Sequence, residues 1–259
     1  MKIIDPLPMY TMWLREMIRF FRMKARLVSS FMMPLLFLAF LGIPLSLLPS
    51  GSMPGIPESM NFLDYLAPGI LGMTLLFSSM MAGASVLWDK EFGFLKEVLV
   101  APVNRLSIML GRSLGGMTTS IIQGFMIIGI SVFMGVNVSS VSGLLLSIVF
   151  MVLICATFIG FGVILATQLG DMEGFMSIIS MIQMPIFFAS PAFLPMEMMP
   201  HWIKSIICLN PFTYGIDGLR GSLVGYSTFP LIHDFVILLV ISVVLMILGS
   251  YCFEKMEID

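Results

Sequence analysis

Charged residues are scarce in this chain, and one short stretch concentrates the groups that could do chemistry or bind a partner. The stretch Trp88–Arg112 reads WDKEFGFLKEVLVAPVNRLSIMLGR and lies between two long apolar runs. It carries Asp89, Lys90, Glu91, Lys96, Glu97, Arg105 and Arg112. Because ionised side chains are costly in hydrocarbon, this stretch is predicted to lie outside the lipid.

The sequence lacks the patterns that enzymatic chemistry would need. His201 and His233 are isolated, and the three cysteines, Cys155, Cys208 and Cys252, have no C-x-x-C spacing. There is no G-x-S-x-G sequence and no Walker sequence G-x-x-x-x-G-K-[ST]. We therefore predict no catalytic residue, no metal site and no cofactor bound by this chain.

Composition points to a polytopic membrane protein. Of the 259 residues, 58% are hydrophobic and 11% charged, and the mean hydropathy is +1.04, whereas soluble domains are about 25% charged. Residues 1–259 are expected to form one all-α integral membrane domain. Six apolar runs are long enough to cross a bilayer, because about 20 helical residues span the hydrocarbon core. These predicted spans are 27–48, 66–87, 108–133, 141–168, 174–193 and 232–253.

The distribution of basic residues predicts the orientation. Eleven of the 13 Lys and Arg residues lie before the first span, in Trp88–Arg112 or after the last span. The positive-inside rule then places both termini and Trp88–Arg112 in the cytoplasm of a multi-pass cell-membrane protein.

The energy for any active transport is expected to come from another protein. No charged residue is expected in the interior of the six spans, and residues 113–170 carry none. A carrier driven by H⁺ or Na⁺ needs such groups, and ATP hydrolysis needs a Walker sequence. Phe92, Leu95 and Leu99 are spaced to share one helical face, so 89–99 could dock into a partner as a short helix. A solvated loop fits the pattern equally well.

Two further segments are predicted to lie at the membrane surface. Residues 6–26 place aromatic and aliphatic side chains on one helical face and arginines on the other, which suits an interfacial helix or, alternatively, a solvated basic tail. Residues 194–231 are apolar but broken by prolines. Short helices dipping into the outer leaflet or a plain extracellular loop would both fit.

Polar and small residues within the spans suggest where helices pack or a cargo passes. Gln123, Gln183, Phe187 and Phe188 are candidates for a substrate path, although packing is the favoured role for any one glutamine. Glycines such as Gly111 and Gly115 are expected to let helices of the same chain approach closely.

Two motifs resemble type-2 ABC-transporter permeases, especially the daunorubicin/multidrug-exporter-like subgroup. WDKEFGFLKEVLVAPVNR is similar to the segment between spans 2 and 3 of that family, which forms a cytoplasmic coupling helix on the ATPase. The segment from Phe187 to Gly221 is similar to the end of its fifth span and its outer re-entrant helices. This chain has Phe94 where many members carry Thr, and Ser190-Pro191 where Ser-Gly is common.

The resemblance assigns roles to particular residues. The ATPase-coupling residues would be Asp89, Lys90, Glu91, Phe92, Gly93, Phe94, Leu95, Lys96, Glu97, Leu99 and Pro102. The outer re-entrant motif would comprise Asn210, Pro211, Tyr214, Asp217 and Arg220.

The resemblance also implies a function. The chain would be the permease subunit of an ATP-driven exporter, moving a drug-like, lipid or glycan-lipid amphipath outward by alternating access. It would pair with a second permease chain, as a homodimer, and with ABC ATPase subunits that hold ATP and Mg²⁺; no nucleic acid is involved. The alternatives are a non-transporting membrane scaffold for an ATPase and, less favoured, an intramembrane enzyme.

Overall fold

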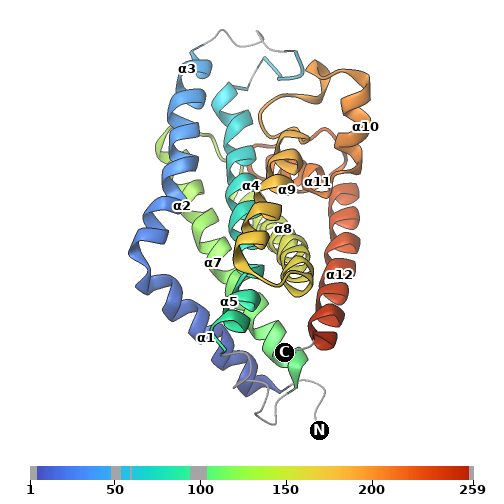
Figure 1. Cartoon of the computed structure of the whole chain (residues 1–259). Coiled ribbons are helices and arrows are strands. Elements are labelled where there is room, and N and C mark those ends of the chain that lie inside the picture. Colours follow the sequence, from blue (N-terminus) through green and yellow to red (C-terminus); the bar gives the residue numbers. More distant parts are fainter. Residues whose placement is uncertain (1–4, 48–53, 59, 94–103, 257–259) are drawn as a thin grey trace.

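The computed structural model describes residues 5–47, 54–58, 60–93 and 104–256, and these ranges contain helices and no strand (Figure 1). The helices are α1 (Pro6–Arg22), α2 (Lys24–Phe37), the π turn η1 (Leu38–Gly42), α3 (Ile43–Ser46), α4 (Phe62–Gly83), α5 (Ser85–Glu91), α7 (Arg105–Phe133), α8 (Val141–Gln168), α9 (Met172–Phe188), the 3-10 turn η2 (Met196–Met198), α10 (His201–Leu209), α11 (Pro211–Leu223) and α12 (Leu231–Lys255). We call the end of the bundle that holds α1 the α1 end, and the opposite end the α10 end (Figure 1).

Within the part of the chain that the structure describes, four helical segments are long and apolar enough to cross a membrane. They are Phe62–Glu91, Arg105–Phe133, Val141–Gln168 and Leu231–Lys255. Ser30–Ser46 and Met172–Phe188 are apolar but shorter. At 1.5 Å per residue, 17 residues rise about 26 Å, close to the hydrocarbon thickness of about 30 Å. The prediction of six spans therefore stays a prediction for the first and fifth of them.

Helix α8 forms the centre of the bundle, and its neighbours approach it at glycines. It packs against α4, α7, α11 and α12. On one side, the backbone of Gly162 faces Gly83 and the Met80 carbonyl of α4, while on another Gly160 faces Gly249 of α12. A Cβ atom at Gly83 or Gly162 would collide with backbone atoms, so these close contacts require the missing side chains. The prediction that glycines serve packing within the chain is confirmed at these positions.

Several helix boundaries near prolines differ from those predicted. Helix α4 begins at Phe62 rather than at 66, so Pro68 lies inside the helix instead of in its first turn. Helix α9 ends at Phe188, so Pro191 lies beyond it and does not kink it. The π turn η1 directly precedes α3, in which Pro44 lacks the N–H that would bond to the carbonyl of Phe40.

Helix α1 buries Met12, Met17 and Phe20 against the protein and leaves part of its apolar stripe exposed. Tyr10, Leu14, Ile18 and Phe21 are exposed, whereas Met12 is buried. The Trp13 indole N–H donates to the Thr118 hydroxyl of α7 at 3.1 Å. Gly111 and Gly115 of α7 lie against α1, as close packing within the chain requires. The predicted helix was expected to continue to residue 26, but it breaks at Met23.

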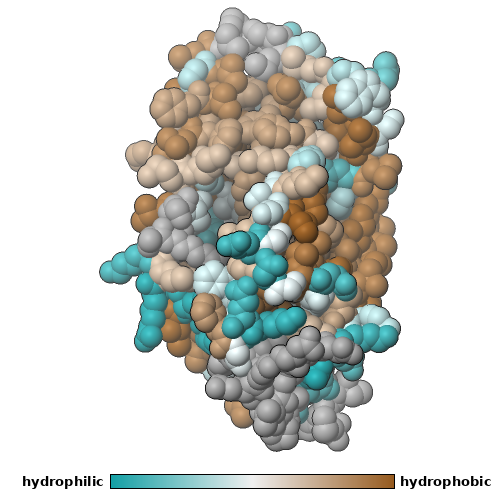
Figure 2. Space-filling model, viewed as in Figure 1, coloured by the Kyte–Doolittle hydropathy of each residue, from teal (hydrophilic) through white to brown (hydrophobic). Residues whose placement is uncertain are grey.

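The surface separates polar from apolar residues along the bundle axis. Hydrophobic side chains cover the flank formed by α12, and hydrophilic side chains gather toward the α1 end (Figure 2). Exposed apolar residues of α12 include Val236, Val240, Val243 and Ile247. An apolar flank of this kind is typical of a helix that faces lipid.

Candidate functional site

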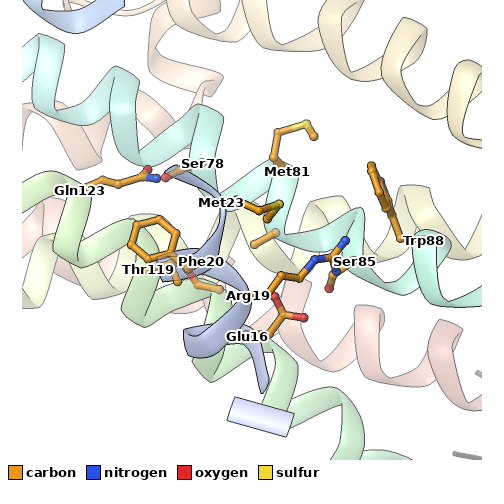
Figure 3. A pocket seen from close by; sticks show the side chains of 12 residues that line it. Glu16, Arg19, Phe20, Met23, Ser78, Met81, Ser85, Trp88, Thr119 and Gln123 are labelled. Atoms are coloured by element: carbon orange, nitrogen blue, oxygen red, sulfur yellow. The ribbon is translucent and has the colours of Figure 1, made fainter. Parts of the chain in front are cut away.

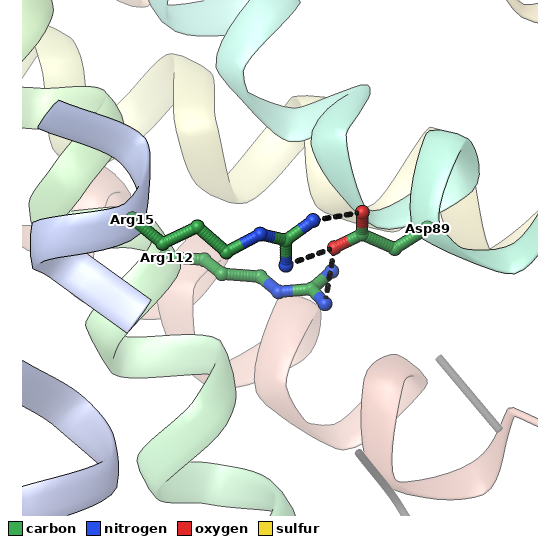
Figure 4. Close-up of polar contacts among 3 residues, drawn as sticks. All are labelled: Arg15, Asp89 and Arg112. Carbon is green, nitrogen blue, oxygen red and sulfur yellow. Dashed lines mark hydrogen bonds and ion pairs between the residues drawn. The ribbon is translucent and has the colours of Figure 1, made fainter. Parts of the chain in front are cut away.

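A buried cluster of three charges joins three helices at the α1 end (Figure 4). Both oxygens of Asp89 in α5 accept from the Arg15 guanidinium of α1, at 2.6 and 3.0 Å. Arg112 of α7 lies 2.5 Å from the second oxygen of Asp89. The side chains of Asp89 and Arg112 are 6% and 3% exposed, so the ion pair lies in a desolvated environment. The triad fixes the end of α5 relative to α1 and α7.

This cluster corrects two expectations. Asp89 was expected on the surface of a docking helix, but it is buried among arginines because α4 and α5 continue the predicted second span through Glu91. Arg112 and Asp234 are charged residues within predicted spans, and both are buried. Each lies within two turns of the start of its helix, where a charge can meet partners from a neighbouring element.

Within the predicted docking segment 89–99, α5 ends at Glu91, and Gly93 follows after Phe92. Gly93 has φ +72°, a left-handed conformation that glycine adopts without strain, and its N–H bonds to the Lys90 carbonyl. Phe92 is 75% exposed, and its ring packs beside that of Trp88. The remaining predicted docking residues, Phe94, Leu95, Lys96, Glu97, Leu99 and Pro102, lie outside the described residues.

Both flanks of residues 94–103 are attached to other helices. On the near side, the Glu91 carboxylate accepts from the backbone N–H of Met172 at 2.7 Å, at the start of α9. On the far side, the Asn104 side chain caps α7 by accepting from Leu106 N–H. The Arg105 guanidinium donates to the Glu254 carbonyl at the end of α12, at 2.8 Å. Together with the triad, these contacts connect the flanks of 94–103 to α1, α7, α9 and α12.

The candidate substrate-path residues do not gather at one place. Gln123 of α7 is buried and lines two cavities of about 200 and 210 Å³. Phe187 of α9 is buried in a cluster of aromatic rings, with Phe77 and Phe193 among its neighbours. Gln183 is 9% exposed, and Phe188 is 62% exposed on the outside of α9. Only Gln123 of the four is placed at a cavity described here.

The first of the two cavities lies between α1, α4, α5 and α7 near the α1 end (Figure 3). Its lining comprises Glu16, Arg19, Phe20, Met23, Ser78, Met81, Ala82, Ser85, Trp88, Gly116, Thr119 and Gln123. The second lies between α2, α4 and α7 and shares Ser78, Met81 and Gln123 with the first. Because they share these lining residues, the two cavities lie side by side, and we call them together the α1–α2 groove.

The predicted outer motif forms a hydrogen-bonded junction at the α10 end. The Asn210 side chain caps α11 by accepting from Phe212 N–H, and its amide donates to the carbonyls of Ile186 in α9 and of Ala189 directly after it. Pro211 occupies the first position of α11, where a missing N–H is harmless. The Tyr214 hydroxyl donates to the Cys208 carbonyl of α10. Asn210 therefore connects α9 with α10 and α11.

Asp217 and Arg220 complete this junction from inside α11. The Asp217 carboxylate accepts from the backbone N–H groups of Thr228 and Phe229, which lead into α12. Arg220 is fully buried and donates to the carbonyls of Tyr65 in α4 and of Pro191 after α9. Residues 194–231 thus contain the short helices α10 and α11, which these hydrogen bonds connect to α4, to the end of α9 and to the segment before α12.

Ionisation of the two tyrosines near this junction is suppressed. Burial raises the pKa of Tyr214 and of Tyr226, and the nearby Glu197 carboxylate adds to the rise at Tyr226. The Tyr226 hydroxyl donates to the Gly55 carbonyl at 2.8 Å. Both phenols are therefore neutral hydrogen-bond donors at physiological pH.

Sequence reasoning missed the partners that hold these residues. Tyr65 gave no pattern of its own, and periodicity placed Arg15 only on the polar face of its helix, because their contacts join residues 155 and 74 positions apart in the chain. Arg112 did carry a signal, since a lone charge close inside an apolar run needs a buried partner. Among the described residues, no group of three His, Cys, Asp or Glu side chains is placed to hold a metal ion.

Comparisons with known proteins show which family this sequence is similar to. The putative transport permease ycf38 of Cyanophora paradoxa is 33% identical over 205 residues, covering 78% of this chain and 70% of the relative. The inner membrane transport permease YadH of Escherichia coli is 24% identical over 191 residues, covering 73% and 74%. The probable multidrug ABC transporter permease YbhR of the same species is 21% identical over 160 residues, covering 61% and 43%. Residues 9–224 match the ABC-2 type transporter family, and the chain therefore belongs to this family of transport permeases.

Proposed function

We propose that this permease is the membrane subunit of an ATP-driven exporter of the daunorubicin/multidrug-exporter-like subgroup, and that residues 89–99 dock on a separate ABC ATPase. Six spans, cytoplasmic termini and a cytoplasmic α1 end belong to this proposal. The observation that carries it is the attachment of both flanks of 94–103 to α1, α7, α9 and α12. A displacement of this segment would be passed directly to four helices.

The working unit in this proposal is a homodimer of the permease with two ATPase subunits, which bind ATP and Mg²⁺. Closure of the ATPase dimer would push on the docking segments and switch the permease between inward- and outward-facing states. The cargo is an amphipathic or hydrophobic compound. The name of YbhR, a probable multidrug permease, and the largely apolar lining of the second cavity, between α2, α4 and α7, support this class.

Site-specific cross-linking tests the docking surface. We would introduce Phe92→Cys and join it to an ABC ATPase recovered with the full chain from its native membrane. Phe92 is 75% exposed at the α1 end, and Phe133→Cys is the matched control because Phe133 is 93% exposed at the opposite end of α7. Cross-linking at position 92 and none at position 133 is expected. Equal cross-linking at both positions would contradict the docking assignment.

Reconstitution in vesicles tests coupling and separates transport from scaffolding. Vesicles holding the chain and its ATPase are expected to expel a fluorescent amphipathic dye in an ATP-dependent manner. Glu91→Gln should reduce dye flux per ATP hydrolysed, because it weakens the bond to Met172 N–H. Glu173→Gln is the control, because Glu173 is an exposed acid in the first turn of α9. ATPase binding without any flux would favour the scaffold.

A further inference from the structure

The α1–α2 groove contains polar groups that no described residue satisfies. Within the first cavity, one carboxylate oxygen of Glu16 and the amide oxygen of Gln123 are buried and accept no hydrogen bond. Buried acceptors without a donor cost free energy, so such atoms indicate a missing partner. Both atoms can be satisfied only by a group that carries N–H or O–H donors.

The same cavity also holds a cation that is not neutralised. The guanidinium carbon of Arg19 lies 5.1 Å from the centroid of the Trp88 ring, and the described residues give it no ion pair. Glu16 and Arg19 lie one turn apart on α1, and both side chains line the cavity (Figure 3), but among the described residues no ion pair joins them. An acid and a base that both line one cavity match a ligand head that carries both charges.

The other half of the groove is suited to a hydrocarbon chain. It is lined by Met33, Pro34, Met73, Phe77 and Met81, together with a few hydroxyl groups. Methionine side chains adapt to flexible apolar ligands. This half lies between α2 and α4, where Met32 and Met33 of α2 are about half exposed on the surface that would face lipid. A chain in the bilayer could therefore extend into the groove.

We propose that the α1–α2 groove is a binding site for an aminophospholipid. The phosphate would bind Arg19, the ammonium group would donate to Glu16 and Gln123, and part of an acyl chain would occupy the methionine-lined half. Arginine suits phosphate because its guanidinium presents paired donors. The proposal goes beyond transport, since binding requires neither ATP nor the ATPase.

Lipid retention measured by native mass spectrometry tests the site. The full chain, purified in detergent, would be mixed with equimolar dioleoyl phosphatidylethanolamine, phosphatidylcholine and phosphatidylglycerol. We expect phosphatidylethanolamine to be retained over phosphatidylcholine by about fivefold or more, the effect of one hydrogen bond. The trimethylammonium group of phosphatidylcholine has no N–H donor, and phosphatidylglycerol has no cation for Glu16.

Matched variants assign the effect to the groove. Glu16→Gln should lower retention of phosphatidylethanolamine to that of phosphatidylcholine, whereas Arg19→Gln should lower retention of all three lipids. Arg22→Gln is the control, because Arg22 lies one turn further along α1 and does not line the cavity. If Glu16→Gln does not fold, Gln123→Leu gives the same readout. Equal retention of phosphatidylethanolamine and phosphatidylcholine, strongest retention of phosphatidylglycerol, or unchanged selectivity in the folded variants would overturn the proposal.

Discussion

The guanidinium carbon of Arg220 lies 3.7 Å from the centroid of the Tyr65 ring, and both side chains donate to the carbonyl oxygen of Pro191. Arg220 also donates to the Tyr65 carbonyl, one turn before Pro68. Pro68 supplies no N–H to the carbonyl of Asp64, four residues earlier, so the hydrogen bonding of this turn is incomplete. Arg220 thus fastens α11 to the proline-bearing part of α4 and to the chain that follows α9.

Replacing Arg220 by lysine should destabilise the protein despite the conserved charge. A lysine ammonium cannot reproduce the planar stacking on Tyr65 together with two directed hydrogen bonds. We expect a loss of about 2 kcal/mol, measured as a lower midpoint of thermal unfolding in detergent. Lys204→Gln is the control, since this residue of α10 is only half-buried. A wild-type midpoint for Arg220→Lys would contradict the role of the guanidinium geometry.

Removing the Tyr65 hydroxyl should have a smaller effect. In Tyr65→Phe the ring still stacks on Arg220, and the Pro191 carbonyl keeps its bond from Arg220. The expected cost is about 1 kcal/mol, that of a single hydrogen bond. The double variant with Arg220→Lys should differ from the sum of the single variants, because the two side chains are in contact. Strict additivity of the unfolding midpoints would show that they act independently.

Neutralising Asp89 should damage both stability and coupling. Asp89→Asn leaves Arg15 and Arg112 facing each other, and Arg112 is 3% exposed. Losing one member of a buried ion pair costs about 3 kcal/mol. The unfolding midpoint should fall, and ATP-driven dye export in reconstituted vesicles should fall with it. Glu173→Gln, which neutralises an exposed acid in the first turn of α9, should change neither measurement.

The double variant with Asp89→Asn and Arg112→Met tests whether the stability lost in Asp89→Asn comes from the unpaired Arg112 cation. The second change removes a cation that would otherwise be buried without its partner, so part of the lost stability should return. A further loss instead of a recovery would show that Arg112 stabilises the protein through some contact other than Asp89.

The glycine contacts of α8 predict that two glycine-to-alanine substitutions at different positions destabilise the protein to very different extents. Gly162→Ala would place a methyl group against the Met80 carbonyl of α4. We expect a cost of about 2 kcal/mol from this overpacking. Gly129→Ala is the matched control in another long helix, because its Cβ meets open space. Thermal unfolding of the two variants in detergent compares them directly. Equal midpoints would argue against close α4–α8 packing.

The sequence was most informative where short-range rules apply. The apolar runs of 28 and 22 residues predicted at 141–168 and 232–253 became α8 and α12 with little change, because length and hydropathy determine such helices. The helix start at Asn210-Pro211 was also predictable, since asparagine caps a helix and proline suits its first position.

Long-range contacts were beyond sequence reasoning. Periodicity placed Arg15 on the polar face of α1, but it could not show that this face turns toward Asp89 rather than toward water. Likewise, a count of charges could not reveal that Glu91 accepts from Met172, because that contact depends on how α5 and α9 pack. The role of the candidate docking segment therefore stays a prediction, while the contacts at its flanks come from the structure.

The paired glycines on α8 limit which parts of the permease can move. Backbone lies against backbone on two sides of this helix, at Gly83–Gly162 and at Gly160–Gly249. Surfaces in such close contact cannot slide past each other by small steps, because every intermediate position brings main-chain atoms into collision. Helices α4, α8 and α12 should therefore behave as one rigid body. Any conformational cycle must then be carried by α1, α2 and α9 around this block, or by rotation of the whole block against a neighbouring subunit.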